Sequence, residues 1–225
     1  MTEDLTPFLQ PGPAVQSEDD AVVGFTRRAI GTETRIIEQV VLLYYAVRDQ
    51  IRYDPYGAVV SVTGLSARRN LEVGHGWCVS KSILLAACCR AIGVPARLGY
   101  ADVRNHLATE KMRSIMQTDI FYWHGYTSIY LDGSWIKATS AFNLELCHKF
   151  RLKPLDFNGR EDSIYHPFDL DGRRHMDYLH DRGEYAEPPI AAMRETFRAE
   201  YPGWNMEGEA IAGDFETDVA LETAS

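Results

Sequence analysis

The sequence predicts an α+β fold in which a buried helix packs against an antiparallel β-sheet. Three observations lead to this prediction: an apolar run with helical spacing follows Cys78, strand-like runs follow that helix, and amphipathic helices precede it. Two of the strands are joined by Asp132-Gly133, a dipeptide typical of a β-hairpin turn. A chain of 225 residues, 45% of them hydrophobic, is long enough to bury a sizeable core.

The N-terminal part of the chain is predicted to be helical after a short lead-in. Residues 1–20 contain three prolines and end in a run of acidic residues, so we expect an extended lead-in. Apolar residues at helical spacing predict helices over residues 21–30 and 34–52. Before the central helix, residues 59–62 are compatible with a short strand and residues 66–70 with a helical turn.

The central helix begins at or near Cys78, directly after a turn that contains Gly74 and Gly76. Gly93 and Pro95 mark its C-terminal end. Its apolar positions recur at i, i+3 and i+4 and form one broad face: Ile83, Leu84, Ala87 and Ala91. A thiol in the first helical turn lies near unpaired N–H groups and the positive end of the dipole, which lower its pKa. This stretch by itself is equally compatible with a nucleophilic thiolate and with a small buried side chain.

Three strand-like runs follow the central helix, over residues 94–101, 120–131 and 134–140. His124 lies near the start of the second run. Residues 103–119, between the first two runs, form a polar excursion that is long for a sheet connection. Such a segment is compatible with a binding loop or with a surface decoration.

The order of these motifs resembles the core of the transglutaminase-like superfamily, a group of cysteine enzymes with a papain-like fold. The resemblance rests on Gly-x-Cys opening a helix that ends in Arg-Ala-x-Gly-x-Pro-Ala-Arg, then Trp-His on a strand, then Asp-Gly-x-Trp before another strand. It covers residues 76–143, and the helix followed by Ile-Arg-Tyr-Asp extends it to about residue 36. The resemblance implies that Cys78 is the nucleophile and that His124 is its base.

The third catalytic residue departs from the pattern of the family. Thr139 stands where the family usually has an aspartate after the hairpin, so the carboxylate is either missing or comes from elsewhere. Asp102 follows the first strand, and antiparallel pairing would bring it beside His124. Asp119 would have to curl back, and Asp132 lies at the wrong end of the strand. We therefore expect Asp102 to complete the triad, although a loop-capping role is the alternative.

Two tryptophans next to the expected catalytic pair are candidates for substrate binding. Trp77 precedes Cys78 and Trp123 precedes His124, so both could flank a cleft, or both could be core aromatics. Histidine pairs at His75/Cys78 and His175/His180 lack a third ligand at a metal-site spacing. We therefore expect no metal and no other cofactor.

The C-terminal third is the least regular part of the sequence. Helices are predicted over residues 144–150 and 190–201, while residues 153–189 are loop-rich and could wall one side of a cleft. Residues 205–225 hold six acidic residues and no basic residue, which predicts a flexible tail. We thus expect one catalytic domain over residues 21–204.

The composition of the chain limits the kinds of molecule that the protein is expected to bind. The net charge of −9 and the lack of a basic run argue against a nucleic-acid surface, and no apolar run is long enough to span a membrane. The four cysteines include two neighbours on one helix and no CxxC, which is typical of reduced thiols. We expect a cytoplasmic protein.

The expected function is acyl transfer through a thioester on Cys78, with His124 as the general base. Hydrolysis of an amide or peptide-like bond is the leading expectation, with a small molecule, a peptide or an acyl thioester as substrate. One alternative is a Dieckmann-type cyclase that takes an acyl chain from a carrier protein. The other is a non-catalytic binding module that retains the fold.

Overall fold

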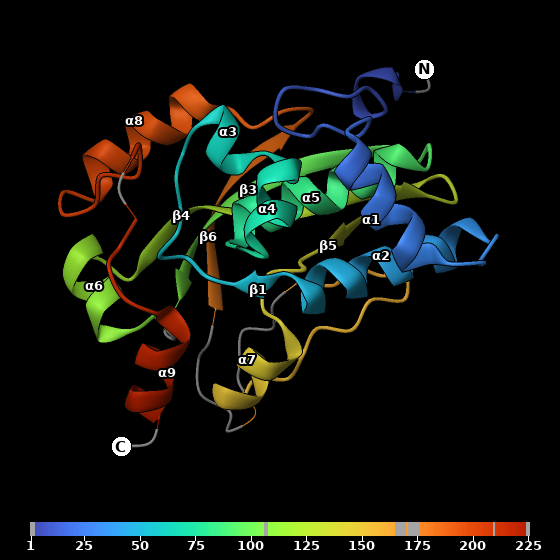
Figure 1. Cartoon of the computed structure of the whole chain (residues 1–225). Helices are drawn as coiled ribbons and strands as arrows, with labels where there is room; N and C mark the ends of the chain where they lie inside the picture. The colour runs from blue at the N-terminus through green and yellow to red at the C-terminus, as the bar shows by residue number, and fades with distance from the viewer. Residues whose placement is uncertain (1–2, 106–107, 165–169, 171–175, 209, 224–225) are drawn as a thin grey trace.

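A four-stranded sheet and one buried helix form the centre of the molecule (Figure 1). The structure is a computed structural model that describes residues 3–105, 108–164, 170, 176–208 and 210–223. Its elements, in chain order, are η1 (Thr6–Phe8), α1 (Asp20–Ile30), α2 (Ile36–Gln50), β1 (Arg52–Tyr53), α3 (Val62–Leu65), α4 (Ala67–Val73), β2 (His75–Gly76), α5 (Cys78–Ala91), β3 (Ala96–Asn105), α6 (Glu110–Met116), β4 (Ile120–Leu131), β5 (Ser134–Ala138), α7 (Leu144–Lys149), β6 (Met176–Tyr185), α8 (Ile190–Glu200) and α9 (Phe215–Thr223).

The sheet is antiparallel throughout, with the strand order β5-β4-β3-β6. β3 and β4 pair over most of their length, and the hairpin turn between β4 and β5 lies at Asp132-Gly133, as the sequence predicts. Gly99 on β3 faces Tyr126 on β4, and a Cβ at Gly99 would lie 2.1 Å from the Tyr126 ring. The sequence-based α+β fold class is confirmed.

Helix α5 is buried on all sides, because the sheet covers one face and α1, α2 and α4 cover the others (Figure 1). Every residue from Cys78 to Arg90 is buried, as expected for a helix with apolar residues around its whole circumference. Two basic side chains on this helix, Lys81 and Arg90, donate to backbone carbonyls, and burial lowers the pKa of Lys81 to about 7. Lys81 donates to the carbonyls of Arg48 and Ile51 at the end of α2, at 3.0 and 2.5 Å.

Arg90, near the other end of α5, ties both outer segments of the chain to the core. Its guanidinium donates to the carbonyls of Ala96, Gln10 and Ala186, at 2.7 to 3.1 Å. The lead-in is further held by Glu187, whose carboxylate accepts from the backbone N–H groups of Ala14 and Val15. The expected extended lead-in therefore packs against the body of the molecule, and it includes the short helix η1.

Several segments differ from the sequence-based prediction. Residues 59–62 do not form a strand, because α3 begins at Val62. The first strand of the sheet continues to Asn105, and the polar excursion after it contains α6. β6 lies inside residues 153–189, which were predicted to be loop-rich. Among the described residues, no helix is both long and apolar enough to cross a membrane.

Helix α9 replaces the flexible tail that the acidic composition predicted. Phe215 and Val219, one helical turn apart, are both buried. The Phe215 ring packs edge-on against the rings of Tyr53 and Tyr56, at centroid distances of 5.7 and 5.4 Å. The Tyr56 hydroxyl donates to the carboxylate of Asp218 at 2.8 Å. Burial of two apolar side chains on one face therefore anchors a segment whose other face is acidic.

Phe215→Ala should lower the free energy of unfolding by about 3 kcal/mol, the usual cost of emptying a buried phenylalanine site. Urea denaturation measures it, and Leu221→Ala is the matched control on the same helix, since Leu221 is 66% exposed. The control should cost less than about 0.5 kcal/mol. Equal and negligible effects of both substitutions would mean that α9 does not pack in solution.

Candidate active site

Cys78 is the first residue of α5, and the preceding backbone is held tightly in place. Trp77 is the N-cap in an extended conformation, and its N–H donates to the Ser80 hydroxyl at 3.1 Å. Before it, β1 and β2 pair in parallel, with Tyr53 opposite Gly76. A Cβ at Gly76 would lie 2.2 Å from the Asn70 side chain, so only glycine fits this approach to the helix.

β4 reaches the same end of α5 at Gly125. A Cβ at Gly125 would lie 2.9 Å from both the Ser82 hydroxyl and the Val79 Cα, and 3.1 Å from the Cys78 carbonyl oxygen. The Thr127 hydroxyl donates to the Ser82 carbonyl at 3.0 Å, which fixes the strand against the helix two residues later. His124, the neighbour of Gly125, is thereby brought to the N-terminal end of α5.

A β-bulge reshapes the two strands at His124. Ala101 pairs with His124 and the next pair is Val103 with Phe121, so β4 carries an extra residue opposite Asp102. Trp123 lies in this bulge with φ of +60°, a left-handed conformation that bulky residues rarely adopt. The Asp102 carboxylate accepts a hydrogen bond from the Trp123 N–H at 3.1 Å and so stabilises the bulge.

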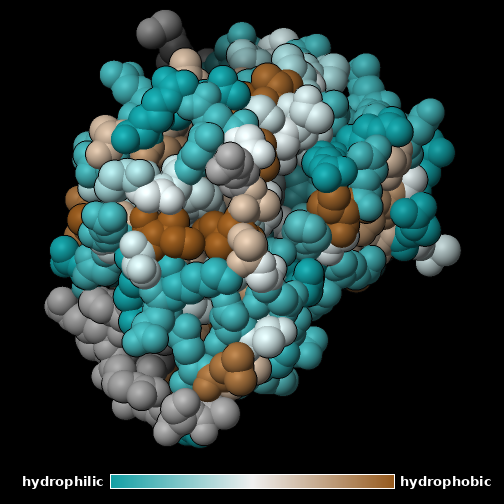
Figure 2. Space-filling model, turned by 60° about the vertical axis from the view of Figure 1, so that its left-hand side comes forward, coloured by the Kyte–Doolittle hydropathy of each residue, from teal (hydrophilic) through white to brown (hydrophobic). Residues whose placement is uncertain are grey.

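Cys78 and His124 line the same cavity. Its volume is about 20 Å³, enough for a single water molecule. The remaining lining residues are mainly aromatic and apolar. They come from the N-cap of α5, from α6, β4 and α8, and from the segments around β1 and after α8: Tyr53, Pro55, Trp77, Met112, Met116, Phe121, Tyr122, Phe197, Tyr201, Trp204 and Met206. Figure 2, which brings the α6 and α8 side forward, shows hydrophobic residues gathered in a band on a largely hydrophilic face. The cavity is too small for an acyl group unless these side chains move.

Burial dominates the ionisation of Cys78. Desolvation raises the pKa of its thiol to about 11, although the backbone N–H groups of Gly125, Val79 and Cys78 itself oppose this rise. The helix N-terminus alone predicted a lowered pKa, and that prediction is wrong for the closed cavity because only 6% of Cys78 is exposed. In this state the sulfur is a neutral thiol near pH 7, and a neutral thiol can act as a nucleophile only if a base takes its proton.

The other predicted site residues fall into two groups. Trp77 lines the cavity beside Cys78, whereas Trp123 packs edge-on against Tyr100, with ring centroids 5.7 Å apart. Asp102 is 5% exposed and lies within β3 rather than after it. Asp119 forms a partly exposed ion pair with Arg104 at 3.0 Å, so the structure does not bring it to the cavity.

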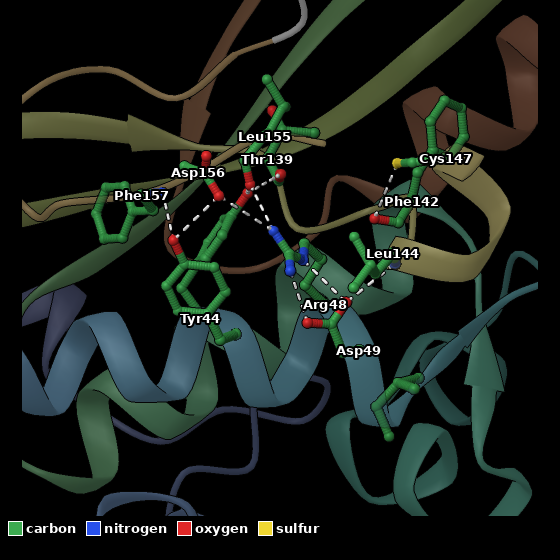
Figure 3. A network of polar contacts seen from close by, with 12 residues as sticks. Tyr44, Arg48, Asp49, Thr139, Phe142, Leu144, Cys147, Leu155, Asp156 and Phe157 are labelled. Atoms are coloured by element: carbon green, nitrogen blue, oxygen red, sulfur yellow. Dashed lines mark hydrogen bonds and ion pairs between the residues drawn. The ribbon is translucent and has the colours of Figure 1, made fainter. Parts of the chain in front are cut away.

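Thr139, at the position where an aspartate was expected, belongs to a separate polar network (Figure 3). Its carbonyl oxygen and that of Leu155 lie 3.1 and 2.9 Å from the Tyr44 hydroxyl oxygen and share its one proton. Arg48 on α2 donates to the same Leu155 carbonyl and pairs with Asp49. This network fastens the segment after β5 to α2, and the described residues that line the cavity do not include Thr139.

Sequence reasoning missed one charged residue beside the expected triad. Arg182 on β6 pairs with the Asp102 carboxylate at 2.8 Å. The signal that could have revealed it is the alternation of residues in 176–185, but the charges of this edge strand obscure that pattern. Of the histidines considered as metal ligands, His175 lies outside the described residues. Within the described part of the chain, no group of three metal-ligating side chains occurs.

Comparison with known proteins identifies the family. Residues 23–140, more than half of the chain, match the model of the transglutaminase-like superfamily. The chain belongs to the transglutaminase-like superfamily. This membership agrees with the resemblance in the sequence and makes the protein a relative of cysteine enzymes with a papain-like fold.

This chain is also similar to a solved structure from Cytophaga hutchinsonii that is named as a candidate cysteine protease. The two chains are 25% identical, with a TM-score of 0.47, over 62% of this chain and 43% of the other. The chain thus matches less than half the length of that protein. The curated proteins yielded no match.

Iodoacetamide should modify Cys78 before the other three cysteines, because Cys78 lines the cavity while Cys88 and Cys89 are fully buried inside α5. Since the pKa of the Cys78 thiol is about 11, the rate should rise about tenfold per pH unit from pH 8 to 10. Peptide mapping after timed quenching measures both, with Cys78→Ser as the control. Faster labelling of Cys147, or a rate independent of pH, would contradict this description of the site.

Proposed function

We propose that this protein is a cysteine hydrolase that cleaves an amide or peptide-like bond through a thioester on Cys78. The observation that supports the proposal is that Cys78 and His124 line one cavity at the N-terminal end of α5. A nucleophile and a base that share a cavity form the minimum arrangement for covalent acyl transfer. Membership of the transglutaminase-like superfamily supports the same class of chemistry.

The reaction has two halves in this proposal. His124 accepts the thiol proton as the Cys78 sulfur attacks the carbonyl carbon, which suits a thiol that burial keeps protonated. His124 then gives the proton to the leaving amine, and the thioester remains on Cys78. Water attacks the thioester with His124 again as base, which releases the acid and restores the thiol.

Asp102 is the residue proposed to orient His124. It lies opposite the bulge that precedes His124 and already accepts the N–H of the adjacent Trp123. A carboxylate in this position can accept the far ring N–H of the histidine, select its tautomer and stabilise the imidazolium. Thr139 would bring no charge, and it belongs to the network on α2.

The oxyanion would be held by N–H donors at the end of α5. The Cys78 backbone N–H is one donor, because the first N–H groups of a helix have no intrahelical partner. Trp77 and Trp204 line the cavity, and among the described residues neither buried indole N–H has a hydrogen-bond partner. A carbonyl oxygen entering this apolar cavity would satisfy such a donor, and Trp77 adjoins the nucleophile.

The character of the cavity indicates the acyl group. Methionines, phenylalanines and tryptophans line the space next to the thiol, so an apolar acyl or side-chain group is favoured over a charged one. Because the cavity holds only about 20 Å³, substrate entry requires the side chains of α6, α8 or the segment after α8 to move. This movement would also expose the Cys78 thiol.

A panel of N-acyl amides, short peptide anilides and acyl thioesters tests the proposed function. We expect an apolar amide or peptide anilide to be hydrolysed, with a transient acyl adduct on Cys78 detected by intact mass. Cys78→Ala should abolish turnover, and His124→Gln should reduce kcat by at least about 100-fold. Turnover that survives in Cys78→Ala would overturn the proposal. A cyclised product from a thioester would indicate the cyclase. The absence of both an adduct and turnover would indicate a binding module.

Asp102→Asn keeps the shape of the side chain and removes its charge. With the substrate identified above, we expect kcat to fall by at least about tenfold, because the asparagine no longer stabilises the imidazolium. The melting temperature and the Cys78 labelling pattern serve as controls for folding. If kcat stayed within about threefold of the wild type, Asp102 would not be the third member of the triad.

A further inference from the structure

The Asp102 carboxylate forms a bidentate ion pair with the guanidinium of Arg182. The Arg182 Nε lies 2.9 and 3.0 Å from the two carboxylate oxygens, and its Nη2 lies 2.8 Å from Oδ2. Asp102 and Arg182 sit on adjacent strands near a register shift between β3 and β6. Bidentate geometry of this kind makes an arginine–carboxylate pair both strong and directional.

The same guanidinium also covers the aromatic residues of the bulge. It lies 4.8 Å from the centroid of the Trp123 ring and 5.9 Å from that of Tyr122. The Asp102 carboxylate accepts a hydrogen bond from the Trp123 backbone N–H. Trp123, with its positive φ, is therefore held at its backbone by Asp102 and at its ring by Arg182. Only 22% of the Arg182 side chain is exposed, which limits screening of its charge by solvent.

We propose that Arg182 is a positioning residue of the active site, which clamps Asp102 and moderates the negative charge that this carboxylate presents to His124. The inference rests on the proposed function, because the role of Asp102 as the partner of His124 is part of that proposal. A bare buried carboxylate beside an imidazole favours the imidazolium, which cannot act as a base. A carboxylate shared with an arginine still orients the imidazole but stabilises the imidazolium less.

The groups around His124 come from several elements. Cys78 on α5 lines one cavity with His124, Tyr53 and Tyr201. Asp102 on β3 lies opposite the bulge that precedes His124, and Arg182 on β6 binds the Asp102 carboxylate. Burial raises the pKa of both tyrosines above its usual value, so both stay neutral in the range where a histidine titrates. Tyr122 on β4 also stays neutral for this reason. Among these described groups, Asp102 and Arg182 are therefore the charged pair.

The chain supplies a matched control on the same strand as Asp102. Arg97 on β3 pairs with Glu184 at 3.0 Å and lies over the rings of Trp135 and Phe8. It has the same combination of carboxylate pairing and ring contact as Arg182, and its side chain is 13% exposed. It lies on β3 five residues from Asp102. Arg97→Met should therefore lose a comparable carboxylate pair and ring contact without changing the titration of His124.

An NMR titration of the His124 imidazole in the full-length protein tests the inference, with His124→Gln used for assignment. In Arg182→Met the pH at the midpoint of the His124 titration should rise by about half a pH unit to one pH unit. In Asp102→Asn this midpoint should fall. Arg97→Met should leave it within about 0.2 units of the wild type. Arg182→Gln, which keeps hydrogen-bond donors but no charge, serves if the methionine variant does not fold, and it should also raise the midpoint. An unchanged midpoint in a folded Arg182 variant would overturn the inference.

A second readout links the charge to reactivity. p-Nitrophenyl acetate transfers its acetyl group to a thiol and releases p-nitrophenolate, so it reports acylation of Cys78 without the natural substrate. At pH 7, Arg182→Met should be acylated about threefold more slowly, and the difference should vanish above about pH 8.5, where His124 is neutral in both proteins. A deficit that persists at every pH would indicate a structural role alone and would contradict the inference. If Cys78→Ala were acylated like the wild type, the proposed function would fail, while the NMR titration would still decide the role of Arg182.

Discussion

The contact between β4 and the first turn of α5 is the constraint on which the site depends. A side chain at Gly125 would overlap Val79 and Ser82, so glycine lets the strand backbone reach the helix. The extra residue in β4 then sets the direction of the strand before His124, with Trp123 in a left-handed conformation. Strain of this kind persists only where surrounding contacts hold it, and Asp102 supplies one of them.

Burial of α5 determines how the thiol can react. The helix lies between the sheet and three other helices, which fixes its N-terminus but also removes Cys78 from water. Desolvation therefore outweighs the helix N-terminus in the ionisation of the thiol. In the proposed reaction, a closed, apolar cavity suits a mechanism in which the proton leaves the thiol during the attack.

The parts of the fold that follow a strong local pattern could be predicted from the sequence. Helix α5, the β4–β5 hairpin and the pairing of β3 with β4 have clear apolar periodicity and turn residues. β6 was missed because an edge strand tolerates charged residues, and Asp177, Asp181 and Arg182 hide its alternation. Helix α9 was missed because two buried side chains, Phe215 and Val219, outweigh an acidic composition.

The candidate site could be predicted only in part for the same physical reason. Cys78, His124 and Asp102 lie on elements with local signals. The predicted pairing of β3 with β4 therefore accounts for the position of Asp102 beside Trp123, the neighbour of His124. The pairing of Asp102 with Arg182 depends on β6, which lies 80 residues away in the chain. The bulge at Trp123 depends on contacts from three strands, and no local pattern encodes it.

The separation of the Cys78 sulfur and the His124 ring in a crystal structure of the full-length protein tests the central claim most directly. Proton transfer requires near hydrogen-bond reach, so we expect a ring nitrogen within about 4 Å of the sulfur, with the bulge at Trp123 present. A ring nitrogen more than about 6 Å from the sulfur, with no movement of β4 that could close the gap, would contradict the account.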